Sequence, residues 1–377
     1  MQKLDSNIDV SVVIPCLNER ESIAAVIKEA RSCFGPSDYR YEILVADNGS
    51  TDGSQVISES LGCRVVVIQE RGYGAALLGG ISSALGRYVV MADADGSYRF
   101  MDSLQMIPLL ESGADLVMGN RFLGGIEPGA MPWLHRWLGN PLLSHLGRAL
   151  YKVPISDFHC GLRAFRKESI ERLNLRCPGM EFASEMVVMA GVKNLRIFEV
   201  PVRLFPDTRS REPHLRTWSD GWRHLRFLLV YSPRWLFAFP AACMTLFGMT
   251  VFAIGVNGAV STGSLELSYR AAVLSSVMVM IGMTAAGSFL IARDAIDPGD
   301  QHQRPRQLFI RSSVTSFVLG SVLLIWQFVS WTLSGFGTQE VGRGTTLTIL
   351  GSTLLGIGAI GLLTSIVRTV IRATYIK

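Results

Sequence analysis

Hydrophobic and polar positions divide this chain of 377 residues into two unlike parts. After Arg234 charged residues become rare, and four stretches contain none at all: Trp235–Leu265, Ala271–Ala292, Ser312–Gln339 and Gly344–Val367. Each is longer than the ~20 residues that a helix needs to cross the hydrocarbon core of a bilayer. A buried helix of a soluble protein is an adequate account of one such stretch, but a poor account of four in succession. The pattern therefore predicts four transmembrane helices.

Upstream of Arg234, short apolar runs alternate with segments of helical spacing, which predicts alternating strands and helices. The expected strands are Val10–Ile14, Tyr41–Val45, Cys63–Ile68, Tyr88–Ala92 and one beginning at Leu116, and the expected helices are Asn18–Arg31 and Gly74–Leu85. Such alternation predicts a mostly parallel sheet, which binds ligands at the carboxyl ends of its strands. Three polar clusters follow predicted strands: Pro15–Glu19, Asp47–Asp52 and Asp93–Asp95.

Each cluster has a structural interpretation beside a functional one. Asp93 and Asp95 place two carboxylates at one strand end, which suits a hard divalent cation or a solvated turn. The stretch Asp47–Ser54 has the composition of a turn and a helix N-cap, whether or not Asp47 also contacts a ligand. Gly72-Tyr73-Gly74 before a helix would suit a phosphate, but it is neither a Walker loop nor a complete dinucleotide motif, because Leu77 stands at the third glycine position.

Composition limits the class of protein. Hydrophobic residues make up 49% and charged residues 18% of the chain, and the mean hydropathy is +0.30. These values exclude a disordered chain and argue against an ordinary soluble protein. The six cysteines form no CxxC pair, so neither a disulfide framework nor a structural zinc site is expected, and a reducing compartment fits. The first ten residues contain no apolar run typical of a secretory signal.

Basic residues predict the orientation in the membrane. Four arginines lie in the 293–311 connection and three basic residues follow the last predicted span, whereas the 266–270 and 340–343 connections hold one arginine each. The positive-inside rule places the N-terminal domain and both chain ends in the cytoplasm, in a protein of the cytoplasmic (inner) membrane. Because no predicted span contains an acid or base, an ion-coupled transporter is not expected.

Two amphipathic segments precede the first span. Met131–Tyr151 places two tryptophans and several leucines at helical spacing, interrupted at Pro141, and is interpreted as an interfacial helix, with a core helix as the alternative. Thr217–Leu229 has the same character. The segment Arg203–Arg234 carries seven arginines and three acids, which would bind either phosphate groups of a substrate or anionic lipid headgroups.

Several motifs in order resemble the family 2 glycosyltransferases, and among them the polyprenyl-phosphate type. They are VVIPCLNE (12–19), ILVADNGSTDGS (43–54), RGYGAALLGGI (71–81), YVVMADADGSY (88–98), MGNRF (118–122), DFHCGLRAFR (157–166) and FASEMVV (182–188). The resemblance implies a GT-A-like α/β domain over residues 1–206, a basic juxtamembrane segment over 207–234 and a four-helix transmembrane domain over 235–377. It implies an inverting enzyme that moves a hexose from a nucleotide sugar, UDP-glucose or GDP-mannose before others, to a polyprenyl phosphate.

The resemblance also implies roles for individual residues. Asp93 and Asp95 would hold Mg²⁺ or Mn²⁺ against the donor diphosphate, and Asp95 and Asp157 would be catalytic. Nucleotide-sugar contacts would come from Pro15, Asn18, Glu19, Asp47, Arg71, Gly74, Asp93, Ala94 and Asp95; acceptor-phosphate contacts from Arg121, Arg136 and Asn140; and a diphosphate loop from Arg209, Arg211 and Arg216.

Two positions depart from the family pattern. Asn48 stands where a second Asp is common, and Gly96-Ser97 stands where the metal motif often continues with Leu-Gln, which leaves the third metal ligand open.

A phosphate acceptor changes what the site must supply. Its second pKa lies near ~6, so it is largely a dianion at neutral pH and needs positioning more than deprotonation. Asp157 is the best candidate for a base or positioning group, with a structural cap as the alternative. His159 and Cys160 are expected to make packing or polar contacts rather than a catalytic dyad.

Two other functions compete with lipid glycosylation. A processive polysaccharide synthase would carry Gln-x-x-Arg-Trp, but Tyr231 replaces the Gln before Arg234-Trp235. A catalytically silent scaffold or flipping partner would not need Asp93 and Asp95. The expected partners are the nucleotide sugar, the polyprenyl phosphate, the bilayer and further copies in a homo-oligomer such as a tetramer, with no nucleic acid.

Overall fold

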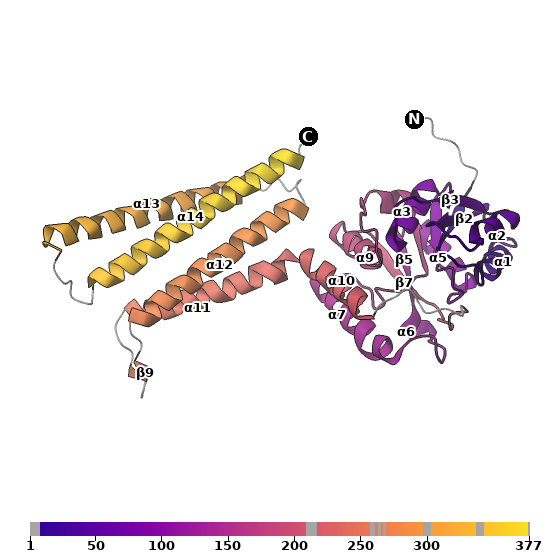
Figure 1. Ribbon diagram of the computed structural model, residues 1–377, viewed down its shortest axis with the longest axis horizontal. Coiled ribbons are helices and arrows are strands. Elements are labelled where there is room, and N and C mark those ends of the chain that lie inside the picture. Colours follow the sequence, from indigo (N-terminus) through magenta and orange to yellow (C-terminus); the bar gives the residue numbers. More distant parts are fainter. Residues whose placement is uncertain are drawn as a thin grey trace. The chain divides into compact units, whose positions relative to one another are not determined.

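The computed structural model describes residues 8–208, 217–256, 261–262, 265–266, 269–296, 303–336 and 343–375. The chain divides into two compact units, Met1–Leu228 and Leu229–Lys377. The first is an α/β unit with helices around one sheet, and the second consists of long helices (Figure 1).

The sheet of the first unit has seven strands in the order β3-β2-β1-β4-β6-β5-β7. In the described part of this sheet only β6 runs antiparallel to its neighbours. The strands are β1 Val10–Cys16, β2 Tyr41–Asp47, β3 Arg64–Val67, β4 Tyr88–Met91, β5 Leu116–Asn120, β6 Arg163–Arg166 and β7 Ile197–Pro201. The prediction of a mostly parallel α/β sheet is confirmed, and β6 and β7 are additions to it.

Helices accompany the sheet, and some of them pack on each of its two faces. They are α1 Ile23–Phe34, α2 Ser54–Ser60, α3 Tyr73–Ser83, α4 Met101–Leu104, α5 Met106–Glu111, α6 Arg121–Gly124, the π-helical turn η1 His135–Gly139, α7 Asn140–Tyr151, α8 Lys167–Glu171, α9 Phe182–Val192 and α10 Thr217–Val230. On one face, the apolar sides of α1 and α5 pack against alternate residues of β1 and β4. On the other, α3 approaches so closely that a Cβ at Gly80 would lie 2.6 Å from Val13 Cγ1.

The first helix begins later than its apolar spacing predicts. Residues 18–22 form a turn instead of helix, because Asn18 has a positive φ of 58° and its side chain is bonded to the next loop. The helix begins at Ile23, whose N–H donates to Glu19 O. Pro141 does not end the interfacial helix: it lies in the first turn of α7, where a missing N–H is tolerated, and the irregularity is the preceding π turn.

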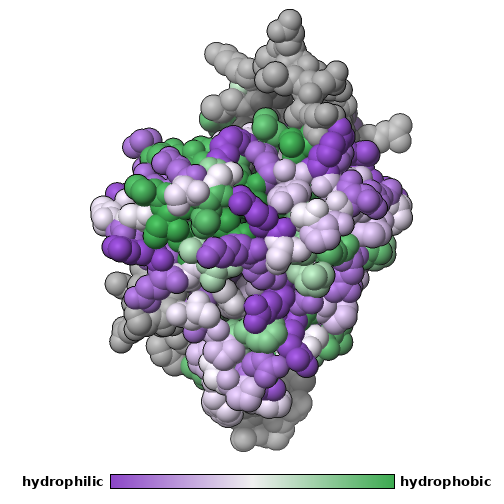
Figure 2. Space-filling model, turned by 90° about the vertical axis from the view of Figure 1, so that its right-hand side faces the viewer, coloured by the Kyte–Doolittle hydropathy of each residue, from purple (hydrophilic) through white to green (hydrophobic). Residues whose placement is uncertain are grey.

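Hydrophilic and hydrophobic residues both lie on the surface of the molecule (Figure 2). Hydrophilic residues cover much of the face drawn in Figure 2, and the largest group of hydrophobic residues on that face lies toward its upper left. Scattered apolar residues on a surface are ordinary, so only those that gather beside a functional group carry information.

The second unit contains η2 Arg234–Ala238, α11 Phe239–Val256, the short strands β8 Ser261–Thr262 and β9 Leu265–Glu266, α12 Tyr269–Ile296, α13 Gln303–Leu333 and α14 Arg343–Tyr375. Its four long helices are long and apolar enough to cross a membrane, over Arg234–Ile254, Ala271–Ile296, Gln307–Leu333 and Thr345–Ile371. The four membrane-length helices predicted from the charge-free stretches are confirmed.

Small residues bring these helices together. Within the described residues, α12 packs against α11 and α14, and α14 packs against α13. A Cβ at Gly320 of α13 would collide with the backbone of Leu355 in α14, and one at Gly282 of α12 would collide with Thr245 of α11. Close backbone approach at small residues is how helices gain packing energy in lipid, where no hydrophobic effect drives them together.

A buried ion pair joins α12 to α14. Arg368 Nε lies 2.6 Å from Asp294 Oδ2, and its Nη2 donates to Oδ1 at 3.2 Å. Both residues lie beyond the charge-free stretches but inside the membrane-length helices. The predicted spans themselves contain no acid or base, but the membrane-length helices extend beyond them, and in these extensions the two charges neutralise each other.

Breaking this pair should destabilise the helical unit. We expect Asp294→Leu to cost about 3–5 kcal/mol, because it leaves the Arg368 guanidinium buried without a counter-charge. The double variant Asp294→Leu/Arg368→Met should recover most of that loss. The apparent unfolding temperature of the full chain in detergent measures both, and equal temperatures for the single variant and the wild type would contradict the account.

Candidate active site

The three polar clusters lie at neighbouring strand ends. In the paired strands, Cys16 of β1 faces Asp47 of β2, and Val13 of β1 faces Met91 of β4. Because these strands are parallel, the segments that leave β1, β2 and β4 emerge at one edge of the sheet. The expected convergence of the clusters is therefore present in the structure.

Hydrogen bonds join the first two clusters. Asn18 Oδ1 accepts from Thr51 N at 2.8 Å, and Asn18 N donates to Ser50 Oγ at 2.9 Å. Glu19 is buried, and its N–H donates to Ser54 Oγ at 2.9 Å. The positive φ of Asn18 turns the chain so that these bonds form. These hydrogen bonds hold the two segments together. Pro15 is buried in β1.

Asp47 organises the turn that follows β2. It is fully buried, and its Oδ2 accepts from Gly49 N at 2.9 Å, Ser50 N at 3.1 Å and Gln55 Nε2 at 2.6 Å. This is the turn that the sequence predicts. Asn48, at the position where the family often has Asp, donates to Glu70 O and accepts from Gly72 N. An Asp there could not donate, so Asn48 fits its partners.

Cys177 and Pro178 pack closely against the start of α3. A Cβ at Gly72 would collide with Pro178 O, and one at Gly74 with Cys177 O, while Ala75 N donates to Pro178 O at 3.1 Å. Close packing thus explains both glycines, and the Ala75 N–H in the first turn of α3 already has an acceptor and is not free for a phosphate. Arg71 Nη1 donates to Asn48 O at 2.5 Å, which places this arginine over the turn after β2.

Asp93 and Asp95 lie in the turn after β4. Tyr73 OH donates to Asp93 Oδ1 at 2.8 Å, and Ser97 N donates to Asp95 Oδ1 at 3.0 Å. The backbone of Gly161 approaches so closely that a Cβ there would collide with Asp93 Oδ2. Ala94 between the carboxylates is buried. The two carboxylates are partly exposed oxygen donors, the ligand type that Mg²⁺ and Mn²⁺ prefer.

Within the described part of the chain, no third His, Cys, Asp or Glu side chain joins these two carboxylates. Among the described residues, no group of three or more His, Cys, Asp or Glu side chains could hold a metal ion. The two-carboxylate arrangement fits a cation whose remaining ligands come from water and from substrate phosphate oxygens.

Arg121, which follows β5, and Asp157, in the loop before β6, form a buried ion pair. Asp157 Oδ2 accepts from Arg121 Nε at 2.7 Å and from Arg121 N at 3.0 Å, and Asp157 Oδ1 accepts from Nη2 at 2.7 Å. Asp157 is fully buried and Arg121 is 7% exposed. The Asp157 charge, together with hydrogen bonds, holds the pKa of the guanidinium well above its usual value despite burial. The predicted acceptor residue and the predicted catalytic residue are thus partners.

An exposed apolar face lies on η1, on the start of α7 and on the residues just before η1. Its members are Trp133, Trp137, Leu138 and Leu142, each more than half exposed. Phe158 N donates to Ser144 Oγ at 3.2 Å, which ties α7 to the segment that carries Asp157. Arg136 stacks over the Trp137 ring at 5.5 Å, and Asn140 Nδ2 lies 3.5 Å from Met131 Sδ. The exposure of the tryptophans supports the interfacial interpretation over the core helix.

Two histidines meet beside the buried ion pair. Ser184 Oγ lies 3.3 Å from His159 Nε2 and 2.8 Å from His224 Nδ1. Burial, His224 and the charges of Arg121 and Arg163 lower the pKa of His159 well below its usual value. The prediction that His159 makes polar contacts is correct, but its partners lie far away in sequence.

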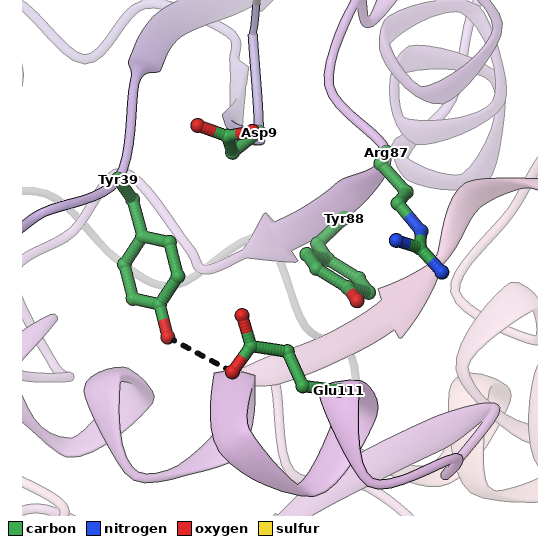
Figure 3. Close-up of a pocket in the computed structure, with 5 residues that line it drawn as sticks. All are labelled: Asp9, Tyr39, Arg87, Tyr88 and Glu111. Carbon is green, nitrogen blue, oxygen red and sulfur yellow. Dashed lines mark hydrogen bonds between the residues drawn. The ribbon is translucent and has the colours of Figure 1, made fainter.

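A pocket also lies away from this edge of the sheet. A cavity of about 470 Å³ is lined by Asp9, Tyr39, Arg87, Tyr88 and Glu111 (Figure 3). Tyr88 begins β4 and Asp9 precedes β1, so the cavity lies at the amino ends of the strands, opposite the polar clusters. Asp9 is already bonded to Arg40, and Tyr39 OH to Glu111 at 3.4 Å.

Arg209, Arg211 and Arg216 of the expected diphosphate loop lie outside the described residues. The preceding segment is placed: Phe205 N donates to Ser97 O, and Thr208 Oγ1 donates to Asp95 O at 2.9 Å. Sequence reasoning missed Tyr73, Ser184 and His224. Tyr73 lies in the quoted motif RGYG, whereas nothing in the sequence signals that Ser184 and His224 meet.

Comparisons with known proteins identify the family of this chain. The sequence model of the family described as Glycosyl transferase family 2 matches residues 11–173. The chain is 33% identical over 347 residues to the low-salt glycan biosynthesis hexosyltransferase Agl6 of Haloferax volcanii, covering 88% of this chain and 82% of that protein. It is 30% identical to the polyprenol monophosphomannose synthase of Mycolicibacterium smegmatis, covering 51% and 75%.

A solved structure of glucosyl-3-phosphoglycerate synthase from Mycobacterium tuberculosis, in complex with Mn²⁺ and UDP-glucose, superposes with a TM-score of 0.48 at 23% identity, over 60% of this chain and 79% of that one.

The lowered pKa of His159 has a consequence for stability. The unfolded chain binds a proton near pH 6.5 that the folded chain resists, so the free energy of unfolding falls as the pH drops below 6.5. This contribution changes by at most about 1.4 kcal/mol per pH unit. His159→Gln should therefore lose less unfolding temperature than the wild type between pH 7 and pH 5. The exposed His145→Gln should follow the wild type, and parallel curves for all three proteins would contradict the assignment.

Proposed function

This chain belongs to glycosyl transferase family 2, and from that membership we propose that it moves a hexose from a nucleotide sugar to a polyprenyl phosphate. UDP-glucose and GDP-mannose are the donors proposed first. One in-line displacement would invert the anomeric carbon and give a lipid-linked monosaccharide.

The proposal of a polyprenyl phosphate acceptor rests on one observation: the buried Arg121–Asp157 pair lies beside the exposed apolar face of η1 and α7. A guanidinium fork matches two phosphate oxygens as well as it matches a carboxylate. Exposed tryptophans and leucines next to it suit the hydrocarbon chain that such a phosphate carries at a membrane surface. Arg136 and Asn140, on the same helical segment, are proposed as further contacts to the phosphate.

The donor would occupy the edge formed by β1, β2 and β4. Pro15, Asn18, Glu19 and Asp47 would line the nucleotide pocket, because hydrogen bonds hold their segments as one wall. Arg71 over the turn after β2, together with Gly74 and Ala94, would complete it.

Asp93 and Asp95 would hold Mg²⁺ or Mn²⁺, and their oxygen donors fit such an ion. When bound, the ion would supply Lewis-acid stabilisation of the charge that develops on the leaving diphosphate. Tyr73 orients Asp93 through its hydroxyl, and Ser97 N orients Asp95. Thr208 is bonded to Asp95 O, so the next residues of the chain, Arg209, Arg211 and Arg216, are proposed to contact the diphosphate.

When the acceptor binds, Arg121 would donate hydrogen bonds to its phosphate and to Asp157 at the same time. Asp157 accepts three bonds from Arg121 in the structure, so a phosphate on the guanidinium must share these donors with the carboxylate. Asp157 then limits how far the side chain moves and keeps it aimed. A phosphate dianion needs no deprotonation before it attacks the sugar. What it requires most is to be positioned in line with the bond that breaks.

The proposed setting is the cytoplasmic (inner) membrane, with residues 1–206 as the transferase domain, 207–234 as the juxtamembrane segment and 235–377 as the anchor. The arginine bias of the connections supports a cytoplasmic N-terminal domain and cytoplasmic chain ends. A homo-oligomer such as a tetramer is compatible with the large exposed apolar area of the four helices.

Loss of Asp95 should abolish transfer. Purified full chain with undecaprenyl phosphate, Mn²⁺ and a panel of labelled UDP- and GDP-sugars should move label from one donor into the organic phase. Asp95→Ala should lower the rate by at least about 100-fold, because the leaving charge loses its electrostatic stabilisation. Exposed Asp38→Ala is the matched control and should keep wild-type transfer. Equal activity of Asp95→Ala and the wild type would exclude the assigned site.

The apolar face should act on the acceptor alone. We expect Trp133→Ser/Trp137→Ser to raise KM for undecaprenyl phosphate about tenfold or more, since each buried aromatic ring contributes roughly 1.5–3 kcal/mol. KM for the donor should not change. Val56→Ser, at an equally exposed apolar position on α2, is the control. A change in donor KM with unchanged acceptor KM would contradict the role of this face.

A further inference from the structure

Helix α10 packs with one side against other elements of the first unit. His224, Phe227 and Leu228 recur at the spacing of one helical face, and all three are buried. Residues 231–233 separate α10 from Arg234, where the first membrane-length helix begins. The reaction as proposed so far assigns no role to the three buried residues.

Two hydrogen bonds of α10 lead to different parts of the proposed acceptor site. Ser184 Oγ on α9 lies 2.8 Å from His224 Nδ1 and 3.3 Å from His159 Nε2. His159 belongs to the loop before β6. At the end of α7, Tyr151 OH donates to Leu228 O at 2.5 Å. One bond of α10 therefore leads to the loop before β6, and the other to the helix that bears part of the exposed apolar face.

The hydrogen bonds between the two histidines and the serine have one consistent direction. His159 Nδ1 is inaccessible to water and has no hydrogen-bond partner among the described residues. A buried N–H without an acceptor is rarer in proteins than a bare lone pair, so we assign the ring proton to Nε2, which donates to Ser184 Oγ. The single hydroxyl proton of Ser184 then goes to His224 Nδ1. In this arrangement His159 joins its loop to α9 and contacts no substrate.

The loop that His159 anchors carries half of the buried ion pair. The backbone N–H of His159 donates to Asp157 Oδ1 at 3.4 Å, and the same carboxylate is the counter-charge of Arg121. Between them, Phe158 N donates to Ser144 Oγ of α7 at 3.2 Å. Because the loop is bonded to both α7 and α9, a shift of either helix would move the carboxylate that aims the guanidinium.

We propose that Ser184, His224 and Tyr151 are positioning residues for the acceptor: by holding α10 against α9 and α7, they fix the spacing between the phosphate site and the apolar face. This inference rests on the proposed function. A polyprenyl phosphate contacts both parts at once, so each contact strengthens the other only while that spacing is held. If the two parts moved independently, the phosphate and the hydrocarbon chain would bind as two separate, weaker ligands.

The chain length of the acceptor tests this role. Undecaprenyl phosphate can reach both parts of the site, whereas geranyl phosphate, whose chain is much shorter, depends mainly on the phosphate site. We expect the wild type to have a higher kcat/KM for undecaprenyl phosphate, and Ser184→Ala to reduce this advantage roughly tenfold. His224→Leu should act in the same direction. His224→Asn, whose Oδ1 replaces the accepting Nδ1, should restore most of the advantage.

Two further variants separate positioning from a general loss of stability. Ser103→Ala removes another fully buried serine hydroxyl, which donates to Phe100 O beside α4. This control should keep the wild-type advantage of the longer acceptor even where its unfolding temperature falls. Tyr151→Phe removes only the hydroxyl at the second contact of α10, so it should remain folded and reduce the advantage. KM for the donor should not change in any of these variants.

The outcomes distinguish this inference from the function on which it rests. Equal losses with both acceptors, in Ser184→Ala and in Tyr151→Phe, would overturn the proposal and leave lipid glycosylation intact. A wild type that uses both acceptors equally well would also overturn it, because the apolar face would then play no part. A wild type that releases nucleotide from the donor but makes no lipid product would overturn the proposed function as well.

Discussion

The ion pair between Arg121 and Asp157 is the interaction on which the candidate site depends. Both charges are removed from water, which is tolerated only when hydrogen bonds offset the desolvation of each. Asp157 receives three such bonds from Arg121, one of them from the backbone. Because Arg121 follows β5 and Asp157 precedes β6, the pair closes the end of two paired antiparallel strands. The same fork is the feature that we propose for phosphate recognition, so one interaction serves the fold and the site.

The loop from Asp157 to Arg163 extends this constraint toward the donor side. Gly161 touches Asp93 so closely that no side chain would fit, and its N–H donates to Tyr98 OH at 3.0 Å. Arg163 is fully buried and donates to the carbonyls of Cys160, Phe158 and Ala183, which fixes the loop from within. The residues that we propose for the acceptor and for the metal-bound donor are therefore held by one short, internally bonded segment. This explains how a hexose and a phosphate could be aligned without a large rearrangement of the backbone.

Much of this arrangement could be predicted from the sequence. β-branched runs marked β1, β2 and β4, and parallel pairing then brought their polar ends together. The charge-free stretches gave the four long helices because a bilayer requires that length. The strand β6 escaped prediction because it is only four residues long and begins and ends with arginine, one of them buried against carbonyls instead of exposed. The pairings of Ser184 with His224 and of Asp294 with Arg368 join residues far apart in sequence, and no local pattern encodes them.

We propose that this chain places one hexose on a lipid phosphate, and the mass of the lipid product decides whether it does. The full chain would be incubated with undecaprenyl phosphate, Mn²⁺ and the active nucleotide sugar, and the organic phase examined by mass spectrometry over time. We expect a single product that is heavier than the acceptor by one hexose and does not grow further. A ladder of longer glycans, or sugar polymer that is not attached to lipid, would contradict it and favour a processive synthase.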